Sequence, residues 1–177
     1  MIIIKHKFRH FENKSDIQTL ILGTFNPDIV KNNAVFFYGR GKDYLWNLLP
    51  KVFGNSELKQ SNYNERISFI EKYKIGFVDL IEEISIEDDS DISYSDKELD
   101  RMCKKWTDFE LFVVKYPNIK AVYFTRKSFQ GIPNMEKQIE WIRKFCQYKN
   151  INFFMLPTPA RFENQDKLNE WKEIFNL

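Results

Sequence analysis

The stretch TLILGTF, Thr19–Phe25, decides the fold class. Its apolar residues run almost without interruption, which is typical of a strand covered on both faces in a parallel sheet. Similar runs lie further along the chain, at Ile75–Leu80, Ile119–Phe124 and Ile151–Leu156. The sequence therefore predicts four buried, mostly parallel strands.

Amphipathic segments separate these runs and predict the helices. They are Tyr44–Phe53, a helix whose last residues are Ile67–Tyr73, and then Trp106–Tyr116, Asn134–Tyr148 and Asn164–Leu177. Alternation of strands and helices favours the α/β class, as a three-layer α/β/α sandwich around a central, mostly parallel four-stranded sheet. The 177 residues suit a single domain over positions 1–177.

Composition excludes several classes of protein. No apolar run approaches the ~18 residues that a membrane span needs. Cys103 and Cys146 are too few for a disulfide framework or a zinc-site spacing, and no Walker A or Gly-x-Gly-x-x-Gly motif is present. We therefore expect a cytoplasmic protein, a monomer, with no membrane partner, metal or cofactor.

The charge is unevenly distributed. Between residues 82 and 100 there are nine acidic residues and one basic residue, which gives this segment a net charge of −8. Because the whole chain has a net charge of +2, the other 158 residues together carry +10. One interpretation is a basic surface that meets a polyanion while the acidic segment points elsewhere. The alternative is a solvated acidic loop on an ordinary surface.

Polar loops should follow the strands at the edge of the sheet where such folds bind ligands. Three of the six glycines, at 23, 39 and 41, lie in the segment that follows the first strand. Glycine there permits close approach of the backbone to a ligand. The same segment supplies candidate polar and aromatic residues, which are Thr24, Phe25, Asn26, Asp28, Phe37, Tyr38, Arg40, Lys42 and Asp43.

The last strand leads into a stiff loop, Leu-Pro-Thr-Pro-Ala-Arg-Phe at 156–162. Its two prolines restrict the backbone at the ligand-binding edge. Arg161 and Phe162 would suit contact with a phosphate or insertion into a base stack. The alternative is a rigid connection into the final helix.

Four motifs in this order resemble the uracil-DNA glycosylase superfamily, and within it the branch that acts on hypoxanthine as well as uracil. That branch has a strand ending in Gly-Ser-x-Pro, then Tyr-Tyr-x-x-x-x-Asn-x-Phe-Trp, Gly-Ile-x-x-Trp-Asp-Val-Leu and Leu-Pro-Ser-x-Ser-Pro-Ala. The matching segments here are LILGTF at 20–25, FYGRGKDYLW at 37–46, IGFVDL at 75–80 and LPTPA at 156–160. The resemblance covers about residues 18–177.

This resemblance implies hydrolysis of the N-glycosidic bond of a deaminated base in DNA, either a damaged or mismatched duplex or a single strand. Asp43 stands where the branch has its helix-opening Asn, so it is the first candidate to position or activate water, with Asn26 and Asp28 as alternates. Gly23, Thr24, Phe25, Phe37 and Tyr38 are the expected base-binding residues. Those expected to contact DNA are Arg40, Lys42, Arg126, Lys127, Thr158, Arg161 and Phe162.

Departures from the family pattern keep other interpretations open. Asp43 replaces the Asn, Asn26 is displaced by one residue from the Gly-Ile-Asn-Pro of mismatch-specific relatives, and the last loop has no histidine. His6 and His10, near the N-terminus, are not expected to be catalytic. Asp43 could instead cap the following helix. Alternatives to the glycosylase are an inactive nucleic-acid-binding domain of the same fold and a small-molecule nucleoside hydrolase.

Overall fold

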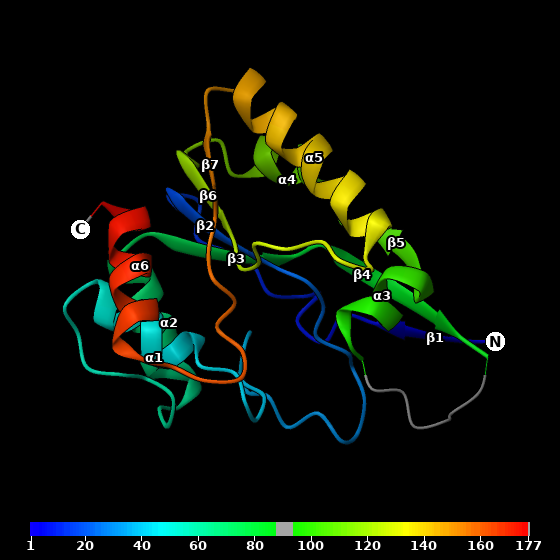
Figure 1. The fold of residues 1–177 in the computed structure, drawn as a ribbon, viewed down its shortest axis with the longest axis horizontal. Coiled ribbons are helices and arrows are strands. Elements are labelled where there is room, and N and C mark those ends of the chain that lie inside the picture. Colours follow the sequence, from blue (N-terminus) through cyan, green and yellow to red (C-terminus); the bar gives the residue numbers. More distant parts are fainter. Residues whose placement is uncertain (88–93, 177) are drawn as a thin grey trace.

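A parallel four-stranded sheet forms the centre of the computed structural model, which describes residues 1–87 and 94–176. Its strands lie in the order β3 (Ile75–Asp79), β2 (Thr19–Gly23), β6 (Ala121–Phe124) and β7 (Asn152–Met155) (Figure 1). All three neighbouring pairs are parallel. Each strand falls within one of the apolar runs, so the predicted sheet is confirmed.

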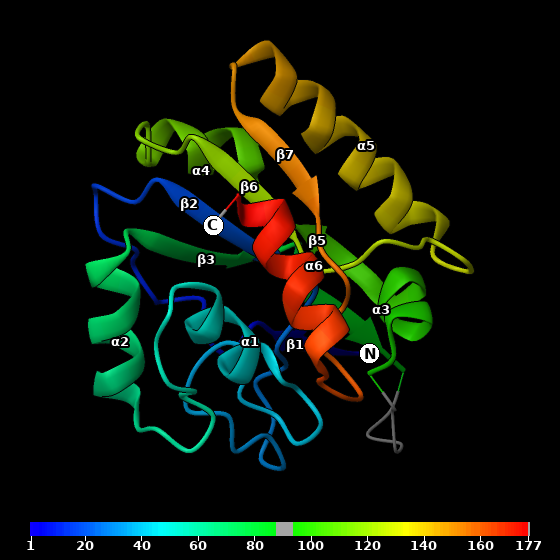
Figure 2. The same ribbon diagram turned by 60° about the vertical axis from the view of Figure 1, so that its left-hand side comes forward.

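Side chains that alternate along the strands bury both faces of this sheet. Leu20 and Leu22 join one apolar cluster, with helices α4 (Phe109–Lys115) and α5 (Pro133–Tyr148). Ile21 joins the other cluster, on the opposite face, with α1 (Leu45–Val52), α2 (Tyr63–Lys72) and α6 (Gln165–Phe175). Figures 1 and 2 show these two helical layers on either side of the strands. The predicted α/β/α sandwich is therefore confirmed.

A second sheet, which the sequence pattern did not predict, adjoins the first. Its antiparallel strands lie in the order β1 (Ile2–Lys5), β4 (Ile81–Ile86) and β5 (Cys103–Trp106), and helix α3 (Asp96–Met102) precedes β5. The predicted helix at 106–116 accordingly starts later, at Phe109, where the Asp108 carboxylate accepts a hydrogen bond from the Leu111 N–H at 2.9 Å. The pattern missed this sheet because β4 and β5 contain no continuous apolar run and the run in β1 is only three residues long.

Part of the acid-rich segment lies within these elements. Glu82 and Glu83 lie on β4, where they pair with Lys105 at 2.5 Å and Lys5 at 3.9 Å. Asp88, Asp89 and Asp91 lie outside the described residues. The described part of the segment therefore includes strand residues with ion-pair partners and is not only a solvated loop.

Asp100 shows that an acid of this segment also has a structural role. It is 3% exposed, and its carboxylate accepts hydrogen bonds from the backbone N–H of Met135 at 2.6 Å and of Asn134 at 3.3 Å. These N–H groups belong to the first turn of α5, where no intrahelical acceptor exists. Asp100 thus joins α3 to the N-terminus of α5.

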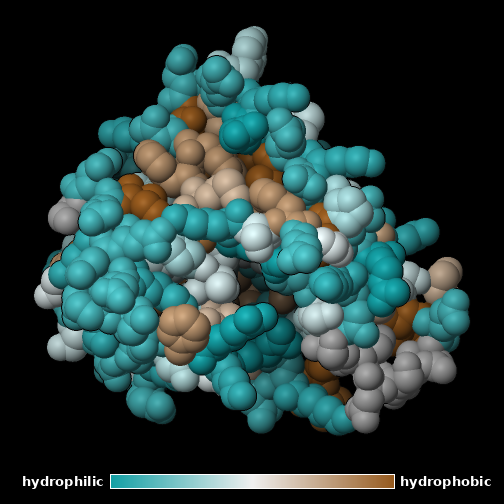
Figure 3. Space-filling view, in the orientation of Figure 1, coloured by the Kyte–Doolittle hydropathy of each residue, from teal (hydrophilic) through white to brown (hydrophobic). Residues whose placement is uncertain are grey.

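The surface is mainly hydrophilic in the view of Figure 3, with apolar side chains gathered over β6 and β7. Phe153, Phe154 and Met155 of the edge strand β7 are half-buried there. Among the described residues, no helix combines the length and the apolar character that a membrane crossing requires.

We predict that Asp100→Ala lowers the free energy of unfolding by about 2 kcal/mol, because it leaves buried N–H groups at the start of α5 without an acceptor. Urea denaturation measures the change. The control is Asp108→Ala, which removes the exposed cap of α4 and should cost about 1 kcal/mol or less. Equal effects of the two variants would contradict the structural role of Asp100.

Candidate active site

The two loops expected to form the site meet at the carboxyl edge of the parallel sheet. Asp43 and Ala160 form an isolated antiparallel bridge. The Tyr44 N–H donates to the Pro159 carbonyl at 2.9 Å, and the Arg161 N–H donates to the Lys42 carbonyl at 3.0 Å. The predicted juxtaposition of segments 23–43 and 156–162 is therefore confirmed.

A cavity of about 190 Å³ opens between these loops. Its lining residues come from the last residue of β3, from the segments that follow β2, β6 and β7, and from the region of α3. The lining residues are Thr24, Phe25, Asn26, Tyr38, Arg40, Asp43, Asp79, Tyr94, Asp96, Leu99, Thr125, Thr158, Pro159 and Ala160. Seven of the expected site residues, Thr158 among them, thus lie around one cavity.

Gly23 lies beneath two polar side chains of this cavity. A Cβ atom at this position would lie 2.2 Å from Asp79 Oδ1 and 2.5 Å from the Tyr38 hydroxyl oxygen, so only glycine fits. The Tyr38 and Thr125 hydroxyls are hydrogen-bonded at 2.8 Å. Burial, and then the charge of Asp79, hold the pKa of Tyr38 well above its ordinary value, so its hydroxyl keeps its proton.

Asp43 presents a carboxylate with one oxygen engaged. Its Oδ1 accepts a hydrogen bond from the Leu45 N–H at 3.1 Å, and no described residue bonds to Oδ2. Asp43 thus bonds to the first residue of α1, as the capping alternative expected, but the N-cap residue of that helix is Tyr44. Burial raises the pKa of Asp43 to about 7, against the opposing effects of the Leu45 hydrogen bond and of Arg40. The side chain can therefore exchange a proton near neutral pH.

Asn26 is 5% exposed, and a neighbouring amide fixes its orientation. Asn32 Oδ1 accepts from the Ala34 N–H at 3.1 Å, so Asn32 Nδ2 is the atom that donates to Pro27 O at 2.7 Å and to Asn26 Oδ1 at 2.6 Å. Asn26 must therefore turn its oxygen toward Asn32. Its nitrogen has no hydrogen-bond partner among residues 1–87 and 94–176.

Asp79, at the end of β3, is a cavity residue that the sequence reasoning did not single out. It is 7% exposed, and its Oδ2 lies 2.7 Å from Nε2 of His6. The other ring nitrogen, Nδ1, accepts a hydrogen bond from the Phe8 N–H at 3.1 Å, so the proton belongs on Nε2 and His6 is the donor. An acidic residue within the otherwise apolar run IGFVDL at 75–80 was the signal that could have identified it.

The expected DNA-contacting cations fall into two groups. Arg40 lines the cavity, Lys42 and Arg161 are exposed beside it, and none of the three forms an ion pair within the described part of the chain. Arg126 instead pairs with Asp96, and Lys127 pairs with Glu170. Only the first group leaves its charge available at the cavity rim.

The structure places two of the expected site residues away from the cavity. Phe37 is 3% exposed and stacks on Phe77 at a centroid distance of 5.5 Å, so it belongs to the aromatic core and has no free face for a base. Asp28 is exposed and pairs with Arg9 at 2.6 Å. Neither residue is positioned for the role expected of it.

Phe162 follows Arg161 and is 55% exposed, with the Lys167 ammonium 4.1 Å from its ring centroid. An exposed aromatic side chain beside a cavity mouth is suited to contact with a base. Within the described ranges, no group of three or more His, Cys, Asp or Glu side chains is arranged to hold a metal ion.

Comparison with known proteins relates this chain to a DNA glycosylase. It is 27% identical over 110 residues to a protein of Methanosarcina barkeri (strain Fusaro / DSM 804) named hypoxanthine DNA glycosylase. The match covers 62% of this chain and 64% of the relative, so it spans a little less than two thirds of that protein's length. No protein-family model matches the chain.

We predict that Asp43→Asn changes how stability depends on pH. Because the pKa of Asp43 is about 7 in the folded chain and 3.8 is its ordinary value, the folded chain holds an extra proton between these limits. Its free energy of unfolding should therefore fall as the pH rises from about 4 to about 7. The asparagine variant lacks this contribution, so its stability relative to the wild type should increase over the same range.

Urea denaturation at several pH values between 5 and 8 measures this difference. Asp28→Asn is the matched control, because it removes an exposed carboxylate of the same loop. Parallel pH profiles for the wild type and Asp43→Asn would show that Asp43 does not titrate in this range.

Proposed function

We propose that this protein is a DNA glycosylase that hydrolyses the N-glycosidic bond of hypoxanthine or uracil in DNA, as a monomeric cytoplasmic enzyme of base excision repair. The observation that carries the proposal is the Asp43 carboxylate, with a pKa of about 7 and one unbonded oxygen, in a cavity at the ends of four parallel strands. The similarity to a hypoxanthine DNA glycosylase supports the same conclusion.

The size of the cavity suits one base rather than a whole nucleotide. Its volume of about 190 Å³ is below the ~300–1,000 Å³ of pockets for drug-sized ligands. A base inside duplex DNA must leave the stack to enter such a cavity, at a cost of a few kcal/mol that is least for a mismatched base. This difference favours a damaged base over a paired normal base.

Asp43 would be the general base for the water that attacks the anomeric carbon and takes the place of the base there. As the ionised carboxylate, it accepts a proton from the water while the water oxygen bonds to the anomeric carbon. The bond from that carbon to the base nitrogen breaks, and its electron pair leaves with the base. The negative charge of Asp43 also stabilises the positive charge that develops on the sugar.

The rim of the cavity would hold the DNA backbone. Arg40, Lys42 and Arg161 supply positive charge without ion-pair partners in the described ranges, and cations of this kind bind phosphates. Phe162 would fill the space that the flipped base leaves. Tyr38 supplies an aromatic wall inside the cavity.

We predict that Asp43→Ala lowers the single-turnover rate of base excision by about a hundredfold or more, since it removes the general base. The measurement is strand cleavage by alkali after incubation with duplexes that contain hypoxanthine or uracil. Wild-type excision should rise with pH through about 7, the pKa of Asp43. Asp43→Asn should lose this pH dependence, and activity retained in it would show that orientation of the water suffices.

A second outcome of the same assay separates the alternatives. Equal excision by the wild type and Asp43→Ala would remove Asp43 from the mechanism. Absence of excision on every deaminated base would favour an inactive nucleic-acid-binding domain.

We predict that Arg161→Ala weakens DNA binding and reduces its dependence on salt concentration, with little change in melting temperature, because the side chain is exposed at the rim. Fluorescence anisotropy at several salt concentrations measures both quantities. Lys149→Ala is the control, since Lys149 follows α5 at the opposite edge of the sheet, just before β7 begins. Salt-independent activity on free nucleosides would favour the nucleoside hydrolase instead.

A further inference from the structure

Two side chains in the cavity have an unused hydrogen-bonding atom of opposite character. Asn26 presents its amide nitrogen, which is a donor. Asp79 presents Oδ1, an acceptor when ionised, and no described residue bonds to this oxygen. Both residues are more than nine-tenths buried. Neither free atom is itself fully buried, so both atoms are reached from the cavity that the two residues line. An accessible donor and an accessible acceptor that line one cavity and lack a protein partner suit a ligand with the complementary groups.

Both side chains are held in a single orientation. The oxygen of Asn26 is engaged by Asn32, so the amide cannot turn to exchange its nitrogen for its oxygen. Oδ2 of Asp79 is engaged by His6, which leaves Oδ1 over Gly23. The donor and the acceptor are therefore fixed before any ligand binds, which lowers the entropic cost of binding.

We propose that Asp79 and Asn26 recognise the lactam edge of the base, in which a ring N–H stands next to a carbonyl. Asp79 Oδ1 accepts the ring N–H, and the Asn26 amide donates to the carbonyl oxygen. This inference rests on the proposed function, and it assigns the choice of base to these two residues. Hypoxanthine and uracil share this edge.

Deamination is the reaction that creates the lactam edge. Adenine and cytosine carry a ring nitrogen that accepts and an amino group that donates. Replacement of the amino group by oxygen converts the first group into a donor and the second into an acceptor. Against Asp79 and Asn26, the parent bases would place acceptor against acceptor and donor against donor. A site with fixed polar groups rejects a ligand that cannot pair with them by large factors.

The same arrangement separates base recognition from the chemistry. Asp43 is left for the water, as its unbonded Oδ2 belongs to neither contact. The carbonyl oxygen that the Asn26 amide would bind is one of the atoms over which the negative charge spreads as the base leaves, so this contact would stabilise the departing base.

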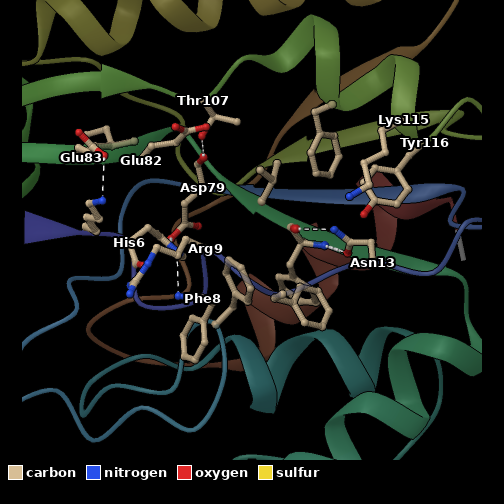
Figure 4. Close-up of a pocket in the computed structure, with 17 residues that line it drawn as sticks. His6, Phe8, Arg9, Asn13, Asp79, Glu82, Glu83, Thr107, Lys115 and Tyr116 are labelled. Carbon is tan, nitrogen blue, oxygen red and sulfur yellow. Dashed lines mark hydrogen bonds and ion pairs between the residues drawn. The ribbon is translucent and has the colours of Figure 1, made fainter.

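His6 is a positioning residue in this proposal. Figure 4 shows His6 beside Asp79 in a second cavity, of about 340 Å³, which Phe8, Arg9 and Asn13 of the N-terminal segment also line. Asp79 lies between the two cavities, because it lines both. Without His6, the carboxylate is free to turn toward the second cavity and water. His6→Ala should therefore weaken recognition of the lactam, while His6→Gln keeps a donor and should restore part of it.

The test is binding of free bases to the whole chain, measured by ligand-detected NMR competition. We expect the wild type to bind hypoxanthine at least about tenfold more tightly than adenine or 1-methylhypoxanthine, which lacks the ring N–H. Asp79→Asn should lose this preference, because it replaces the acceptor by an amide that can donate. Asp16→Asn is the control, since Asp16 is an exposed carboxylate paired with Lys74.

The paired exchange of Asn26→Asp with Asp79→Asn tests the inference in the opposite direction. It reverses donor and acceptor, so the preference should shift toward adenine. Equal binding of hypoxanthine and 1-methylhypoxanthine by the wild type would overturn the inference, and this result needs no variant to fold. An unchanged preference in folded Asp79→Asn would also overturn it.

Excision assays with the same proteins separate this inference from the proposed function. A wild type that prefers the lactam base but releases no base from DNA would sustain the inference and contradict the glycosylase activity. Excision of hypoxanthine that Asp79→Asn leaves unchanged would sustain the activity and contradict the inference.

Discussion

The parallel pairing of β2 with β3 sets Gly23 opposite Asp79, and the arrangement of the cavity depends on this pairing. A side chain at position 23 would occupy the space of Asp79 Oδ1 and of the Tyr38 hydroxyl. The missing side chain therefore lets two polar groups from separate segments approach the same point. Because β3 is mostly buried and pairs with β2 along its length, the position of Asp79 is set by the sheet.

Aromatic packing then fixes the loop that carries the remaining polar groups. Phe36 and Phe37 are buried against Phe77 of β3, and the Trp46 indole N–H donates to the Phe37 carbonyl at 2.7 Å. These contacts anchor the loop on both sides of Tyr38, whose positive φ of 54° turns its side chain out of the regular path. Part of the high aromatic content thus holds this loop.

The parallel sheet was predictable because each strand is a continuous apolar run, and the site's place followed because parallel strands end at one edge. The antiparallel sheet was not predictable in this way, since its strand β5 has the sequence Cys-Lys-Lys-Trp and contains no continuous apolar run. Residue type identified Asp43 and Asn26, but their free atoms depend on neighbours that only the folded chain brings close. The contact of His6 with Asp79 spans 73 residues, which no local pattern encodes.

The N-terminal segment has a significance that the family resemblance does not reveal. The resemblance starts at about residue 18, and everything before it could be taken for an extension. Yet His6 supports a carboxylate of the cavity, β1 completes the second sheet, and Asn13 pairs its amide with both backbone groups of Phe77 along the outer edge of β3. The N-terminal segment is therefore integrated into the fold, and a relative without an equivalent segment would have to restrain the same acid by other means.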